Sequence, residues 1–86
     1  MPLKWPPWWA WELELSPHLW KRMADRGFNE VELREMLERG RAYREDVVEG
    51  RWVVTTSHAQ ETWEVIVEPD REERRLVVVT AYGLGG

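Results

Sequence analysis

The amino-acid sequence predicts an α+β domain in which an N-terminal strand is followed by two helices packed on an antiparallel sheet that ends in a three-stranded meander. Helix-capping residues and helical hydrophobic spacing fill the stretch from Ser16 to Gly40. Strand-forming Val, Thr and aromatic residues dominate the rest of the chain up to Tyr82. Short connections between these later runs favour antiparallel neighbours. A length of 86 residues allows one hydrophobic core.

The chain begins with an arm rich in proline and tryptophan. Proline disfavours helix and pushes the preceding residue towards extended geometry. From Trp9 to Leu15 apolar and polar residues alternate, which is the period of a strand with one buried face. We therefore expect an extended arm over residues 1–8, a single domain over residues 9–82 and a flexible glycine-rich tail over residues 83–86.

The first predicted helix spans residues 17–26. Ser16 is a favoured N-cap, Pro17 suits the first helical position, and Gly27 can adopt the left-handed C-cap conformation. The apolar residues at helical spacing then form one face, made of Leu19, Trp20 and Met23.

A second helix is predicted to start after Asn29 and to end at Gly40. Asn29 and Glu32 stand at the spacing of a capping box, and apolar residues follow with a helical period. Opposite charges four residues apart on its exposed face should each contribute about 0.2–0.5 kcal/mol. These pairs are Glu30–Arg34 and Glu35–Arg39.

The remaining runs, residues 51–57, 62–68 and 75–82, are predicted strands. Turn-forming residues separate them near residues 58–60 and 69–70. The middle run alternates between apolar and polar residues, as in a sheet with one solvated face. The last run is apolar on both faces, so we expect it to be a central strand.

Composition and charge exclude several classes of function. The chain has no cysteine, which excludes disulfides, thiolate zinc sites and thiol nucleophiles. Its 12 basic and 16 acidic residues give a net charge of -4, which argues against binding long nucleic acids through bulk charge. The apolar runs are far shorter than the roughly 18 residues of a membrane helix. We expect a cytoplasmic protein that does not bind a membrane, and its many Arg and Glu residues suggest thermostability.

His18, Arg22 and Arg26 are the first candidate site residues. Residues at i, i+4 and i+8 share one helix face, so an imidazole would lie beside two guanidinium groups. Cleavage of RNA without a metal needs a group that titrates near neutral pH, and cations that hold the phosphate. The alternative interpretation is an ordinary exposed face on which the arginines pair with Asp25 or other acids.

Thr80 and Tyr82 form a second candidate pair, because residues two apart in a strand share a face. Their hydroxyls could orient a base or donate a proton if that face opens beside the first helix. The alternative is that both are ordinary strand residues. No metal or other cofactor is expected, since His58 has no acidic residues at a recognisable ligand spacing.

The tryptophans of the arm are candidates for partner binding. Trp5 and Trp8 could form an exposed patch that stacks on nucleobases or anchors a partner protein. Trp9 and Trp11 are expected to fill the core or a homodimer interface.

The motif residues together resemble a widespread bacterial family of small domains of unknown function that is usually grouped with the RelE- and BrnT-type toxins. The resemblance covers residues 16–82 and leaves the arm out. It rests on His18-x-x-x-Arg22-Met23-x-x-Arg26-Gly27-Phe28, on Val31 and Leu37 of the second helix, and on Val77-Val78-Val79-Thr80-x-Tyr82.

The resemblance implies a RelE-like α+β fold and a metal-independent endoribonuclease that a cognate antitoxin holds inactive, with RNA or the ribosome as its target. By the same resemblance His18 would be the acid or base, Arg22 and Arg26 the phosphate clamp, and Thr80 with Tyr82 the far wall of the site.

Two functions from different classes are therefore expected. The first is RNA cleavage by the His18 face. The second is a non-catalytic interaction module that dimerises or binds a partner through its tryptophan-rich N-terminal region. The net charge of -4 favours the second, because RelE-type toxins are strongly basic.

Overall fold

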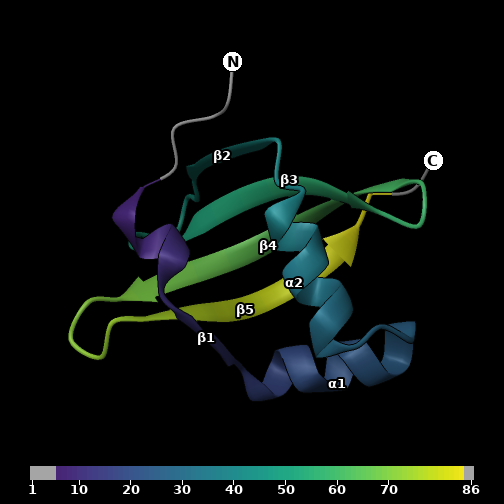
Figure 1. Ribbon diagram of the computed structural model, residues 1–86, viewed down its shortest axis with the longest axis horizontal. Coiled ribbons are helices and arrows are strands. Elements are labelled where there is room, and N and C mark those ends of the chain that lie inside the picture. The colour runs from purple at the N-terminus through teal and green to yellow at the C-terminus, as the bar shows by residue number, and fades with distance from the viewer. Residues whose placement is uncertain (1–5, 85–86) are drawn as a thin grey trace.

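A mixed sheet of five strands forms the centre of residues 6–84, the part of the chain that the computed structural model describes (Figure 1). The strands lie in the order β1-β5-β4-β3-β2. Neighbours from β2 to β5 are antiparallel, as the predicted meander requires. The strands are β1 (Glu12–Leu15), β2 (Ala42–Glu45), β3 (Trp52–His58), β4 (Glu61–Asp70) and β5 (Arg75–Gly83).

The first strand pairs with the last, and the two run parallel. Leu13 lies beside Leu76, and Leu15 beside Val78. The expectation of a wholly antiparallel sheet is therefore wrong at this edge, because β1 and β5 are joined through the helices and the meander rather than by a hairpin. The central position expected for β5 is confirmed, since it lies between β1 and β4.

Both helices begin where their capping residues predict. Helix α1 (Pro17–Arg26) starts after Ser16, whose side chain accepts a hydrogen bond from the Leu19 N–H, and it ends at Gly27 with a φ of 72°. Helix α2 (Glu30–Glu38) starts with the reciprocal capping box of Asn29 and Glu32. Local hydrogen bonding thus sets these helix starts before any tertiary contact is needed.

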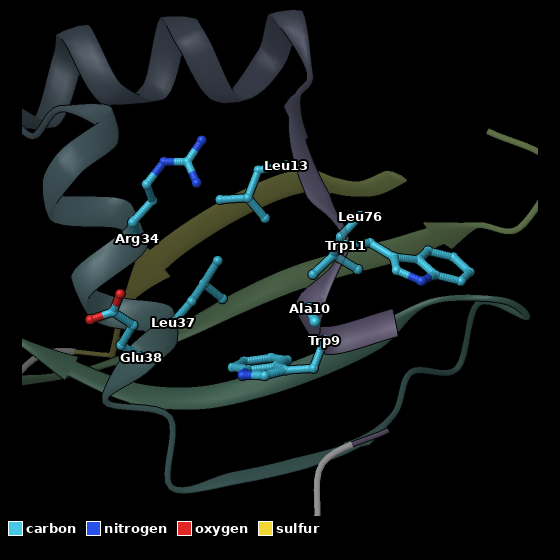
Figure 2. Close-up of a pocket in the computed structure, with 8 residues that line it drawn as sticks. All are labelled: Trp9, Ala10, Trp11, Leu13, Arg34, Leu37, Glu38 and Leu76. Atoms are coloured by element: carbon cyan, nitrogen blue, oxygen red, sulfur yellow. The ribbon is translucent and has the colours of Figure 1, made fainter. Parts of the chain in front are cut away.

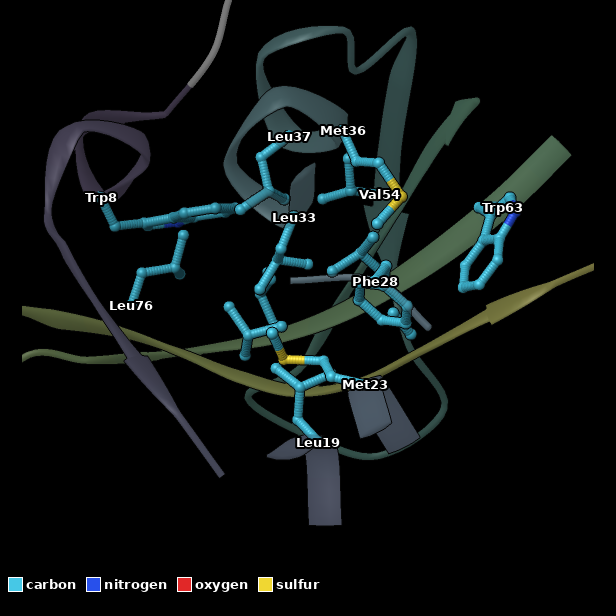
Figure 3. Packing of buried hydrophobic residues seen from close by; sticks show 14 residues of the cluster. Trp8, Leu19, Met23, Phe28, Leu33, Met36, Leu37, Val54, Trp63 and Leu76 are labelled. Carbon is cyan, nitrogen blue, oxygen red and sulfur yellow. The ribbon is translucent and has the colours of Figure 1, made fainter. Parts of the chain in front are cut away.

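The two helices pack on one face of the sheet and enclose a single core (Figure 3). Helix α1 packs against β5, and α2 packs against β3. The side chains between them are almost wholly buried. Those from the helices are Leu19, Met23, Leu33, Met36 and Leu37, and those from the sheet are Val54, Trp63, Val65, Val67, Leu76, Val78 and Ala81.

The N-terminal segment differs from the predicted arm. Residues Pro7–Ala10 form a short 3-10 helix, η1, and β1 begins only at Glu12. Trp8 is 2% exposed, with its ring against those of Trp9, Tyr43 and Trp52 at centroid distances of 6.1, 6.3 and 5.8 Å. The expectation that Trp8 forms an exposed patch is therefore wrong, because its bulk completes the core. Trp5 lies outside the described residues.

The C-terminal segment is more ordered than a flexible tail. Strand β5 includes Gly83, and the Leu84 N–H donates to the Thr62 carbonyl at 2.8 Å. The expectation of a flexible tail is therefore wrong for residues 83 and 84, which continue the pairing of β5 with β4, and residues 85–86 lie outside the described residues.

The exposed face of α2 carries one of its two expected ion pairs. Arg34 lies 3.4 Å from Glu30. Arg39 donates to the Ser57 carbonyl at 3.0 Å instead of pairing with Glu35, which ties the end of α2 to β3. Within residues 6–84, none of the helices is long and apolar enough to cross a membrane.

Candidate functional site

The exposed face of α1 carries a hollow with a volume of about 200 Å³. It is lined by His18, Lys21, Arg22 and Asp25. The last three follow His18 by three, four and seven residues, so all four side chains share one side of the helix. Arg26 belongs to the same helix but does not line the hollow. The structure therefore brings His18 and Arg22 together as expected, with Lys21 as an additional cation.

The basic side chains of α1 are available to a ligand. Among residues 6–84, no hydrogen bond or ion pair engages the side chains of His18, Lys21, Arg22 or Arg26. In this part of the chain neither Arg22 nor Arg26 forms an ion pair with Asp25, so that alternative is not observed. Helix α1 thus has a locally positive surface on a chain whose net charge is -4.

Two hydrogen bonds attach the start of α1 to β5. The Ser16 hydroxyl donates to the Val79 carbonyl at 2.7 Å, and the Ser16 N–H donates to the Val78 carbonyl at 3.2 Å. His18 follows Ser16 by two residues, and Thr80 directly follows Val79. The first turn of α1, which carries His18, is therefore attached to β5 directly before Thr80.

Thr80 and Tyr82 share a strand face, as predicted. Thr80 pairs with Ile66 and Tyr82 with Glu64, whereas Ala81 between them is buried in the core. Both hydroxyl side chains therefore project from the face of the sheet opposite the core cluster. Neither residue lines the hollow on α1, so the expected far wall is not part of that hollow.

The two hydroxyl groups differ in their bonding. The Thr80 Oγ1 atom is buried and has no hydrogen-bond partner among the described residues. The Tyr82 hydroxyl donates to Glu64 Oε1 at 2.6 Å, and Arg44 lies 3.2 Å from the other oxygen of the same carboxylate. Tyr82 is thus held by a neighbour that the sequence analysis did not single out.

The environment of Tyr82 favours its neutral form. The hydrogen bond to Glu64 raises the pKa of Tyr82 above 10.0, because the phenol donates to a carboxylate and phenolate would lose that bond. Desolvation by burial acts in the same direction. Tyr82 is therefore suited to donating a hydrogen bond and is a poor general base at neutral pH.

His58 has a structural environment. Its ring lies against Phe28 and, edge to face, against Trp63, with centroid distances of 6.2 and 5.7 Å. Its Nε2 atom is 3.9 Å from a Glu32 carboxylate oxygen. Within the described residues, no cluster of three or more His, Asp or Glu side chains could hold a metal ion.

A second concavity lies between η1–β1 and α2, and Figure 2 shows its lining. Trp9 and Leu13 point towards α2, whereas the Trp11 ring points away from α2. The volume is about 210 Å³. We call it the N-terminal groove; it is lined by Trp9, Ala10, Trp11, Leu13, Arg34, Leu37, Glu38 and Leu76.

The sequence analysis missed three residues of these sites. Lys21 could have been found, because it stands three residues after His18 on the predicted helix. Glu64 and Arg44 carried no such signal, since their contact depends on the registers of β2 with β3 and of β3 with β4. The pairing of Glu64 with Tyr82 depends in addition on the register shift between β4 and β5 at Ile66 and Val67.

The chain matches the model of a protein family. The family described as "Domain of unknown function (DUF4258)" matches residues 15–83, which include both α-helices and all of β2 to β5. The match begins after η1 and most of β1, so the N-terminal groove is only partly within it. Comparisons with curated proteins and with solved structures gave no match.

Proposed function

The chain belongs to the DUF4258 family, and from that premise we propose that it is a metal-independent endoribonuclease related to the RelE- and BrnT-type toxins. The observation that supports this best is the hollow on α1, where an imidazole and two cations lie together without ion-pair partners among residues 6–84. Metal-independent cleavage of RNA needs a group that transfers protons and groups that stabilise charge on the phosphate, and these three side chains can supply both.

In the proposed reaction, neutral His18 removes the proton from a ribose 2'-hydroxyl. The 2'-oxygen forms a bond to the adjacent phosphorus, and the bond from phosphorus to the 5'-oxygen breaks. The departing 5'-oxygen takes the proton back from the imidazolium, which leaves a 2',3'-cyclic phosphate. Arg22 and Lys21 hold the phosphate oxygens while charge develops on them.

The role of His18 is tested with purified protein on RNA, alone and with ribosomes. His18→Ala should lower the cleavage rate by about 10²–10⁴-fold, the usual contribution of a general acid or base. His58→Ala is the matched control, because that imidazole lies against Phe28 and Trp63 away from the hollow. Equal cleavage by the His18→Ala variant and the parent would refute the proposal.

The role of Arg22 is tested by RNA binding at several salt concentrations. Arg22→Gln should weaken binding and reduce the salt slope by about 1, as expected for one lost phosphate contact. Arg71→Gln removes the same charge from the exposed turn between β4 and β5 and should leave the slope unchanged. Equal slopes for the two variants would show that only net charge matters.

The second proposed function is binding of a protein partner, such as a cognate antitoxin, at the N-terminal groove. This proposal is supported by the apolar lining of the groove beside the charged Arg34 and Glu38. Trp9→Ser should reduce partner recovery and the molecular mass of the complex measured by light scattering. Trp20→Ser is the control, because Trp20 is 53% exposed on α1 and lies outside the groove. Equal recovery with both variants would refute this function.

A further inference from the structure

Within residues 6–84, the outer edge of β1 pairs with no other strand. Strand β1 is the last strand on its side of the sheet and pairs with β5 alone among the described residues. The Ser16 N–H points to β5. Because N–H groups alternate between the two sides of a strand, those of Leu13 and Leu15 point away from β5. An exposed edge of this kind is a template for one more strand.

The side chains of β1 differ sharply between its two faces. Leu13 and Leu15 are partly buried against the core, whereas Glu12 and Glu14 are exposed on the opposite face. Glu14 keeps 53% of its side chain exposed and lies 4.0 Å from Arg75. The edge therefore presents apolar side chains on one face and carboxylates on the other.

We propose that β1 docks an extended segment of a partner protein in which apolar residues alternate with Arg or Lys. Directly opposite residues of paired strands share a face. Apolar residues of the segment would then pack beside Leu13 and Leu15, and its cations would lie beside Glu12 and Glu14. This inference rests on the second proposed function and adds the edge and the chemistry of the partner.

Charge repulsion disfavours pairing of the β1 edge with β1 of a second copy of this chain. Antiparallel pairing of β1 with its own copy would place Glu12 and Glu14 opposite glutamates of the same face, which is destabilising. Parallel pairing would produce the same repulsion. A basic segment removes it, and the net charge of -4 attracts such a segment at long range.

Trp11 supplies a further contact on this side. Its ring points to the side of β1 that faces away from α2 (Figure 2). An indole there lies on the side opposite to Leu13, where it can stack on an arginine of the segment.

The test uses three capped eight-residue peptides with the full chain. The first alternates Val and Arg, the second alternates Val and Glu, and the third has four Val followed by four Arg. The alternating Val/Arg peptide should bind at least tenfold more tightly than either of the others. It should also slow hydrogen exchange at the Leu13 and Leu15 amides, and not along the other edge strand, β2.

Reversing the charges on β1 tests whether the peptide binds at this strand or is attracted only by the net charge of the protein. The double variant Glu12→Lys/Glu14→Lys should lose the preference for the Val/Arg peptide and gain one for the Val/Glu peptide. Glu72→Lys/Glu73→Lys makes the same change in net charge in the exposed turn between β4 and β5 and should keep the original preference.

Three results would overturn the inference: no peptide binds, both double variants behave alike, or protection falls on β2. If Trp9→Ser still reduces partner recovery in any of these cases, the N-terminal groove keeps its proposed function and only the docking edge is refuted.

Discussion

Tyr82 of β5, Glu64 of β4 and Arg44 of β2 form a chain of polar contacts that reaches across β3. The phenol donates to one oxygen of the carboxylate, and the guanidinium lies beside the other. The Glu64 side chain is only 16% exposed, so its charge is stabilised by these two partners more than by water. This chain links β2, β4 and β5 on the face away from the core.

Tyr82→Phe should destabilise the fold at neutral pH by about 1 kcal/mol, since Glu64 loses a donor but keeps Arg44. The effect should depend on alkaline pH. The pKa of Tyr82 is raised in the folded state, so the unfolded chain releases the proton first, near pH 10. The stabilising contribution is therefore complete below pH 10 and declines as pH rises towards the folded pKa.

Urea unfolding of the parent and the Phe variant from pH 7 to pH 11 checks this prediction. The difference in unfolding free energy between them should shrink above pH 10. A constant difference would show that the bond to Glu64 does not control the ionisation of Tyr82.

At the residue scale, the sequence predicts contacts between side chains that lie on the same helix or strand. His18 and Arg22 come together because one helix carries both, and a helix has a fixed period. The partner of Tyr82 depends on strand register, and a slip of one residue would send Glu64 to the other face. That contact could not be predicted from alternation alone.

At the element scale, Ser16 has two functions. Its oxygen accepts from the Leu19 N–H at 3.0 Å, and its hydroxyl donates to the Val79 carbonyl. The residue therefore caps α1 and fixes its first turn to β5. Asn29 caps α2 through Glu32 alone, so its contribution stays within that helix.

Ser16→Ala should destabilise the fold by about 1–2 kcal/mol and also lower any RNA cleavage by His18, because the turn that carries His18 loses its attachment. Asn29→Ala is the matched control. It should cost about 1 kcal/mol and leave cleavage unchanged where both proteins are fully folded. Thermal unfolding and the RNA assay measure the two effects, and equal cleavage by the two variants would contradict a positioning role for Ser16.

The bounds of the helices could be predicted closely from the sequence, whereas strand β2 and the parallel pairing of β1, at the two edges of the sheet, could not. Caps act through neighbours within four residues, so α1 has the predicted bounds. Strand β2 (Ala42–Glu45) has one half-buried residue, Tyr43, and three exposed ones, which leaves no hydrophobic alternation to detect. The parallel pairing of β1 likewise depends on contacts across the whole domain.

At the scale of the whole molecule, Trp8 joins the N-terminal segment to the far end of the sheet. Its ring lies against Tyr43 of β2 and Trp52 of β3, while η1 leads into β1 at the other edge. The sequence placed Trp8 in an extended arm because prolines precede it. Its burial follows from the space left between η1 and the sheet, which no local pattern encodes.

Trp8→Ala should cost about 3–5 kcal/mol, as expected for a large buried aromatic side chain. That is a large part of the stability of a typical domain, about 5–15 kcal/mol. Trp20→Ala should change stability by less than about 0.5 kcal/mol, because Trp20 is exposed. Chemical unfolding measures both, and a small effect of Trp8→Ala would mean that the ring is not part of the cooperative core.

The pairing of β1 with β5 also sets the order in which the domain can form during synthesis. Ser16 and Val79 are 63 residues apart, and β1 has no other strand beside it in the described part of the chain. Of the described strands, β1 is synthesised before β5, so β1 gains a neighbouring strand only after β5 has been made. The turn that carries His18 is attached to the sheet only when β5 is in place, so a chain in which β5 has not yet formed has no assembled candidate site.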